Sequence, residues 1–166
     1  MLIFGIDPGS RSTGYGIIRA LGSRYHCLDY GAIRPGNQTP KDFSSRLSCI
    51  YSRLHSLIET HQPDAVAVEE VFHAVNTRTA LILGQVRGVA LLAAAQHRIP
   101  IFEYSPLKVK KSVVGYGRAE KHQVQMMVKR LLNMEIEPEP DDAADALAVA
   151  LCHAFNRPPA PRSPQH

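Results

Sequence analysis

The sequence predicts an α/β fold in which a five-stranded mixed sheet is flanked by helices. Three short apolar segments follow one another at the start of the chain, which is typical of an antiparallel meander of strands. Segments with helical spacing then alternate with two further short apolar segments, as in parallel β-α-β units. The chain has 166 residues, 45% of them hydrophobic, which suits one ordinary domain.

The first three strands are expected at Leu2–Asp7, Tyr15–Arg19 and Tyr25–Arg34. The first of them ends in Asp-Pro-Gly, a sequence that favours a turn. From Phe43 to Ile58, apolar side chains recur at helical spacing, and the predicted helix stops before Pro63.

Two further strands are expected at Ala65–Val68 and Pro100–Tyr104, separated by a long predicted helix at Thr77–His97. This helix is apolar nearly all round, and such a helix must be buried. Either the sheet of the same chain or a helix of a second chain could cover it.

The last third of the chain is expected to begin with a basic, broken segment at Leu107–Gly117. Helices are predicted to follow at Ala119–Leu132 and Asp142–Phe155. Residues 1–156 therefore form a single predicted domain, and the proline-rich residues 157–166 form a predicted disordered tail.

Composition narrows the class of protein. Lys and Arg number 19 against 15 acids, and the net charge of +4 is compatible with a polyanionic partner. The three scattered cysteines form no CxxC pair, so neither a zinc knuckle nor a disulfide framework is indicated. The chain starts without a signal-peptide pattern, and its most apolar stretch, Thr79–Ala95, falls short of the roughly 20 residues of a membrane span. We therefore expect a cytoplasmic protein with no membrane contact.

Acidic residues stand where the predicted elements meet. Asp7 ends the first strand and Glu69 ends the fourth, and sites in open α/β sheets gather at the carboxyl ends of parallel strands. Residues three or four apart share a helix face, so Asp145 can pair with either Asp142 or Asp141 at the start of the last helix. The spacing thus predicts an acidic cluster but leaves open which of these two acids belongs to it.

Such a cluster suits metal-assisted phosphate chemistry. Mg²⁺ prefers carboxylate oxygens, and two such ions about 4 Å apart can activate water and stabilise a leaving oxygen. Structural roles are the alternative, because Asp142 follows Pro140 as a helix N-cap would, and Asp7 could belong only to a turn. Neither role explains Asp145, which precedes an apolar run and needs a partner.

Several motifs together resemble the RuvC family of bacterial Holliday junction resolvases, which has a ribonuclease H-like fold. The similarity extends from about Leu2 to about Ala154. The segments that carry it are Gly5–Arg11, Thr13–Gly16, Ala67–Phe72, Leu83–Gly88, Val109–Gly115, Ala119–Lys121 and Asp142–Ala148.

The resemblance implies a crossover junction endodeoxyribonuclease that binds Mg²⁺, with Mn²⁺ able to substitute and two ions per subunit. It implies paired symmetric nicks in strands of like polarity, which leave 5′-phosphate and 3′-hydroxyl ends. It prefers Glu69 over Glu70 and Asp142 over Asp141, which leaves Glu70 and Asp141 without a role. The implied catalytic and metal-binding acids are Asp7, Glu69, Asp142 and Asp145.

The resemblance also implies contacts with DNA. Two lysines that matter in the family fall on Lys110 and Lys121, and Lys121 is expected to take part in catalysis. Phe72 matches a family aromatic that touches bases at the junction centre. Lys108, Lys111 and Arg118 cluster with the two lysines and are expected to meet phosphates. The expected partners are a four-way DNA junction, a second copy of the chain in a homodimer, and the RuvA–RuvB branch-migration complex.

Other functions fit the sequence less well. Gly9 and Gly14 have the spacing of the first half of a P-loop, but the required Lys-Ser/Thr is absent. The strand ending in Asp-Pro-Gly is also similar to the phosphate turn of actin- and hexokinase-like ATPases, whose second domain this chain is too short to contain. A junction-binding protein without catalysis is the third possibility, and the presence of all four acids argues against it.

Overall fold

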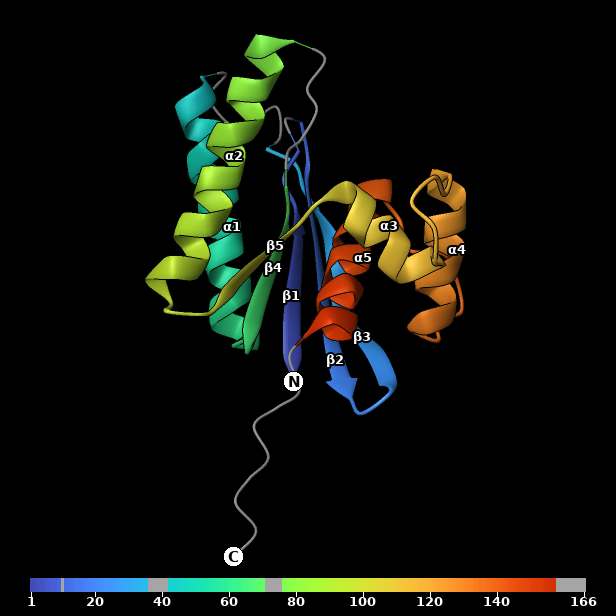
Figure 1. The fold of residues 1–166 in the computed structure, drawn as a ribbon. Helices are drawn as coiled ribbons and strands as arrows, with labels where there is room; N and C mark the ends of the chain where they lie inside the picture. The colour runs from blue at the N-terminus through green and yellow to red at the C-terminus, as the bar shows by residue number, and fades with distance from the viewer. Residues whose placement is uncertain (10, 36–41, 71–75, 158–166) are drawn as a thin grey trace, which may run out of the picture.

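A computed structural model describes residues 1–9, 11–35, 42–70 and 76–157. It contains one five-stranded mixed sheet between two layers of helices (Figure 1). The strands are β1 (Leu2–Asp7), β2 (Thr13–Leu21), β3 (Arg24–Ile33), β4 (Ala65–Glu69) and β5 (Ile101–Tyr104). The helices are α1 (Phe43–His61), α2 (Thr77–Gln96), α3 (Pro106–Val114), α4 (Lys121–Leu131) and α5 (Asp141–Asn156).

The strand order is β3-β2-β1-β4-β5. The first three strands form the expected antiparallel meander, and β4 and β5 run parallel to β1. The predicted fold class is therefore confirmed. The central position of β1 beside β4 places the ends of these two strands, and the acids that they carry, next to each other.

Helices α1 and α2 cover one face of the sheet, and α5 with α3 and α4 covers the other (Figure 1). Asp42 caps α1 by accepting a hydrogen bond from the Ser45 backbone N–H at 2.7 Å. Asn76 caps α2 in the same way through the Thr79 N–H at 2.9 Å. Side-chain caps of this kind fix where each helix begins.

Helix α2 is much less buried within the chain than its apolar sequence predicts. Only four of its residues are buried, namely Val86, Ala90, Ala93 and Ala94. By length and composition alone, its 20 residues are also enough to cross a membrane. This length corrects the expectation that the apolar stretch is too short for that. An ion pair between Arg87 and Glu103 of β5 nevertheless ties the helix to the sheet.

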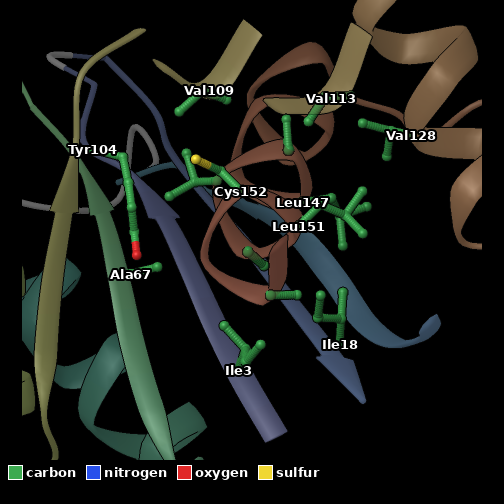
Figure 2. Close-up of a cluster of buried hydrophobic side chains, with 14 of the residues drawn as sticks. Ile3, Ile18, Ala67, Tyr104, Val109, Val113, Val128, Leu147, Leu151 and Cys152 are labelled. Atoms are coloured by element: carbon green, nitrogen blue, oxygen red, sulfur yellow. The ribbon is translucent and has the colours of Figure 1, made fainter. Parts of the chain in front are cut away.

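Helix α5 is the central element of the opposite layer, with eleven of its sixteen residues buried. Helices α3 and α4 pack against it and share a hydrophobic cluster with the sheet (Figure 2). The helix α3 corrects the expectation of a broken segment at Leu107–Gly117. Ser105 caps it, Pro106 occupies its first turn, and Val109 and Val113 form its buried side.

Glycines in β1 and β2 allow α5 to lie directly on the sheet. A Cβ atom at Gly5 would overlap the carbonyl oxygen of Ala146, and one at Gly14 would overlap the carbonyl oxygen of Asp142. Any larger residue at these points would push the helix away from the strands. The predicted tail, 157–166, lies outside the described residues after Arg157.

Candidate functional site

Asp7 and Glu69 lie side by side at the carboxyl ends of two parallel strands. Ile6 of β1 pairs with Val68 of β4, so the residue that follows each of them carries its carboxylate at the same edge. Side chains alternate between the two faces of a strand, and both acids therefore point to the face that α5 covers. Each is half-buried there.

The start of α5 brings two more acids to this edge. Gly14 pairs with Asp7 across β1 and β2, and the backbone of Asp142 lies against Gly14. Asp145 follows almost one helical turn later on the same side of α5. The N-cap of α5 is Pro140, so Asp142 is not the N-cap and that structural alternative is wrong.

Burial, with charge from neighbouring carboxylates, raises the pKa values of three of these acids, Asp7, Glu69 and Asp145. Burial, together with the charge of Asp145, raises the pKa of Asp7 to about 6. Burial and the neighbouring Asp7 carboxylate raise the pKa of Glu69 to about 8, and the two side chains share a hydrogen bond. Burial also raises the pKa of Asp145, against the opposing effect of Lys121. The cluster therefore holds more negative charge than its surroundings stabilise.

Lys121, the first residue of α4, forms ion pairs with two of the acidic side chains at the start of α5. Its Nζ lies 3.0 Å from Oδ2 of Asp145 and 3.3 Å from Oδ2 of Asp141. Gln125, one turn later on α4, donates from Nε2 to Oδ1 of Asp141 at 2.8 Å. The sequence predicted Lys121 at the site. It did not reveal Gln125, because this contact depends on how α4 packs against α5.

A cavity of about 250 Å³ opens between β4, α3, α4 and α5. Its polar lining consists of Glu69, Lys110, Lys121 and Asp145. Lys110 is close enough to Glu69 to oppose the rise in the pKa of that carboxyl. The cavity therefore places two predicted lysines beside two predicted acids. Its apolar lining comes from Pro106, Val109, Val124 and Ala148.

Of the other predicted DNA contacts, three lie among the described residues, and none of these three lines this cavity. Lys108 places its Nζ 5.0 Å from the centre of the Tyr104 ring. Lys111 on α3 and Arg118 before α4 are exposed, and Phe72 lies outside the described residues.

Sequence reasoning also missed Arg34, for which it offered no signal. Arg34 lines a second hollow of about 690 Å³ together with Lys121, Asp141 and Asp142. Lys121 lines both this hollow and the first cavity. Arg34 therefore adds a basic residue to a hollow that two acids also line.

The four acids fit a divalent cation by their chemistry. Carboxylate oxygens are the ligands that hard divalent cations prefer, and a cation would offset the repulsion that raises the pKa values. In the conformation described, no three acidic, His or Cys side chains among the described residues are close enough to bind one ion. Lys121 instead supplies the positive charge between Asp141 and Asp145.

Comparisons with known proteins agree on one family. The family model described as crossover junction endodeoxyribonuclease RuvC matches residues 3–153. The chain is 56% identical over 158 residues to the protein of that name from Alkaliphilus metalliredigens, with 94% of each chain covered. It is 55% identical over 156 residues to the one from Alkaliphilus oremlandii, with 93% of each covered. A structure of Thermus thermophilus RuvC in complex with a Holliday junction substrate is 34% identical, with a TM-score of 0.86 and 93% of each chain covered.

Proposed function

Because this chain belongs to the RuvC family of crossover junction endodeoxyribonucleases, we propose that it resolves four-way DNA junctions through a metal site formed by four acids. The acids are Asp7, Glu69, Asp142 and Asp145. One observation supports the proposal. Strands β1 and β4 and helix α5 bring separate acids to one edge of the sheet, where burial and neighbouring carboxylates raise the pKa values of Asp7 and Glu69. Two lysines line the adjoining cavity.

The family consists of metal-dependent nucleases, and hard oxygen ligands favour Mg²⁺. The family resemblance implies two ions per subunit, with Mn²⁺ able to substitute. When bound, the ions would supply the activation of water and the neutralisation of charge on the departing 3′ oxygen. The four carboxylates would hold the ions, and two of them, Glu69 and Asp145, line the cavity. Lys121 and Lys110 place ammonium groups at its wall, where they stabilise the charge of the scissile phosphate.

The remaining basic residues contribute to DNA affinity. Lys108 and Lys111 lie on α3, which contributes Lys110 to the cavity, and Arg118 lies between α3 and α4. Contacts of this kind neutralise phosphates and carry no sequence information. Phe72 follows β4 and Glu69 in the sequence, where a stacking contact with a base at the junction centre would lie near the acids.

A homodimer suits both the substrate and the surface of α2. The exposed side of α2 carries Leu81 and Leu92, with exposed fractions of 65% and 51%, and lies open at Gly84 and Gly88. Apolar and small residues on one helix face allow a partner helix to approach closely. A two-fold dimer would present two sites to two opposed strands of a junction.

The products would be paired nicks in strands of like polarity, with 5′-phosphate and 3′-hydroxyl ends that can be ligated. This activity belongs to homologous recombination and DNA repair in the bacterial cytoplasm. A RuvA–RuvB branch-migration complex would supply the junctions, as in the family that the sequence resembles.

The test is cleavage of a synthetic four-way junction by the full chain, with strand-by-strand mapping of the cuts. We expect paired nicks with Mg²⁺, and binding without nicks with Ca²⁺ or EDTA. Asp7→Asn should abolish cleavage while junction binding survives, because phosphate contacts dominate affinity. Glu70→Gln is the matched control, because it neutralises the acid next to Glu69 that is not among the four proposed ligands, and it should cleave at nearly the wild-type rate.

Other outcomes would point to other functions. Binding with no Mg²⁺-dependent nicks under any condition would indicate a structural junction-binding protein. Hydrolysis of ATP would indicate the actin- and hexokinase-like class. Loss of both binding and cutting in Asp7→Asn, with the fold intact, would contradict a purely catalytic role for the acid.

A further inference from the structure

Asp141 binds two side chains of α4 at once. Its Oδ1 accepts from Nε2 of Gln125 at 2.8 Å, and its Oδ2 lies 3.3 Å from Nζ of Lys121. Lys121 and Gln125 are four residues apart and so lie on one side of α4. Each carboxylate oxygen of Asp141 therefore has a partner, and these two contacts connect the first residue of α5 to the beginning of α4.

Lys121 has a second acidic partner in Asp145, at 3.0 Å. The two carboxylates differ in their surroundings, because Asp145 is half-buried in the acidic cluster and Asp141 is exposed at its rim. If Asp145 binds metal, as the proposed function states, its charge is no longer free to attract the lysine. Asp141 then remains as the anionic partner of Lys121 that metal binding does not neutralise.

We propose that Asp141 is a positioning residue that keeps the ammonium group of Lys121 at the cavity wall when the neighbouring acids are occupied by metal. This inference rests on the proposed function. It gives a role to an acid that neither the spacing nor the family resemblance explained. Asp141 acts through Lys121 and does not itself touch the phosphate.

Three variants of Asp141 separate charge from shape. Asp141→Asn keeps the acceptor for Gln125 but removes the charge opposite Lys121, and Asp141→Ala removes both contacts. Asp141→Glu restores the charge on a longer side chain. The matched control is Glu137→Gln, which neutralises a nearby acid that pairs with His122 of α4, 3.7 Å away, and does not contact Lys121.

The first measurement is the single-turnover rate of junction cleavage in saturating Mg²⁺. Losing one exposed lysine–carboxylate contact that supports a catalytic cation should lower the rate about three- to tenfold in Asp141→Asn. Junction affinity in Ca²⁺ should change less than about twofold, because one exposed acid contributes little to binding of a polyanion. Asp141→Glu should recover part of the rate, and Glu137→Gln should match the wild type.

The second measurement needs neither metal nor DNA. Acylation of lysines by an N-hydroxysuccinimide ester, followed by mass spectrometry, reports how firmly each ammonium group is held. In Asp141→Asn, Lys121 should react about two- to fivefold faster than in the wild type, because one of its two ion pairs is lost. Lys111, which is exposed on α3, serves as the internal reference.

A double variant tests whether the effect passes through the lysine. In a Lys121→Met background, Asp141→Asn should cause no further loss of rate, because the group that it positions is already absent. An equal loss in both backgrounds would overturn the proposal, as would an unchanged cleavage rate with unchanged acylation of Lys121. Complete loss of the Mg²⁺ response in Asp141→Asn would instead identify the residue as a metal ligand. If the wild type cuts no junction, the proposed function fails, and the acylation result still decides whether Asp141 holds Lys121.

Discussion

At Asp7 and Glu69, burial and the charge of a neighbouring carboxylate, that of Asp145 for Asp7 and that of Asp7 for Glu69, oppose the ionised state of the folded protein. Because folding raises both pKa values above 3.8 and 4.5, to about 6 and about 8, the folded chain binds protons more tightly than the unfolded chain in this window. The metal-free protein should therefore become less stable as pH rises from about 4 to about 8. Glu69→Gln removes a charge that folding disfavours and should stabilise the metal-free protein at pH 8 by about 4 kcal/mol.

Thermal unfolding in EDTA at pH 4 and pH 8 checks this expectation. The stabilisation by Glu69→Gln should be present at pH 8 and small at pH 4, where Glu69 is protonated in both states. Glu135→Gln, an exposed acid outside the cluster, should change little at either pH. Added Mg²⁺ should raise the unfolding temperature of the wild type at pH 8 more than that of Glu69→Gln. An equal rise in both proteins would place the metal elsewhere.

The contacts of single residues could be predicted from the sequence only where regular geometry fixes them. Asp7 and Glu69 meet because parallel strands end at a common edge, and the sequence predicted this meeting only if their two strands were neighbours, as the structure shows them to be. Whether Asp141 or Asp142 joins them depends on the rotation of α5 against Gly14, which spacing leaves open. The contact between Lys121 and Asp145 depends on the packing of α4 on α5 and has no local signal.

At the scale of elements, the predicted strands and most predicted helices are confirmed, and α3 is the exception. Lys108, Lys110 and Lys111 interrupt its apolar pattern, and Pro106 resembles a break. The structure shows why both signals misled, since proline is favoured in the first turn of a helix and the lysines lie outside its buried side. A helix of nine residues has too few turns for the helical spacing of its apolar residues to be recognised in the sequence.

The close approach of α5 to the sheet yields a prediction about two glycines. Gly14→Ala would overlap the backbone of Asp142 and displace the acidic end of α5, whereas Gly16→Ala would meet Leu147 further along the helix. Overpacking of this kind destabilises proteins by about 1–3 kcal/mol, and both variants should unfold at lower temperature. Only Gly14→Ala should also lose most of its cleavage rate when assayed well below its unfolding temperature.

The assay compares single-turnover cleavage in Mg²⁺ with junction binding in Ca²⁺ for the two variants. Retained binding with lost cleavage in Gly14→Ala would show that displacement of Asp142 affects the acids and not the DNA surface. Equal cleavage by the two variants would mean that the end of α5 adapts to the added methyl group. The acidic site would then tolerate more movement than its burial suggests.

For the molecule as a whole, the exposed side of α2 is the feature that a single chain does not explain. Only four residues of α2, a valine and three alanines, are buried within the chain. Leu81 and Leu92 are exposed to solvent. Scattered exposed apolar residues are common, but here they lie on one helix together with two glycines that face open space. A second copy of the chain would bury this side and pair the two acidic sites for one junction.

Charge placed on this side of α2 should therefore separate the subunits. Leu81→Glu combined with Leu92→Glu puts two carboxylates where the dimer would bury leucines, and like charges would face each other across the two-fold axis. We expect a monomer by analytical ultracentrifugation at concentrations where the wild type is a dimer. Paired nicks in one junction should fall much more than single nicks, because each monomer holds one site.

Leu28→Glu, which changes an exposed leucine on β3, is the control and should leave the mass and the paired nicks unchanged. A double variant that stays dimeric would move the interface to another surface.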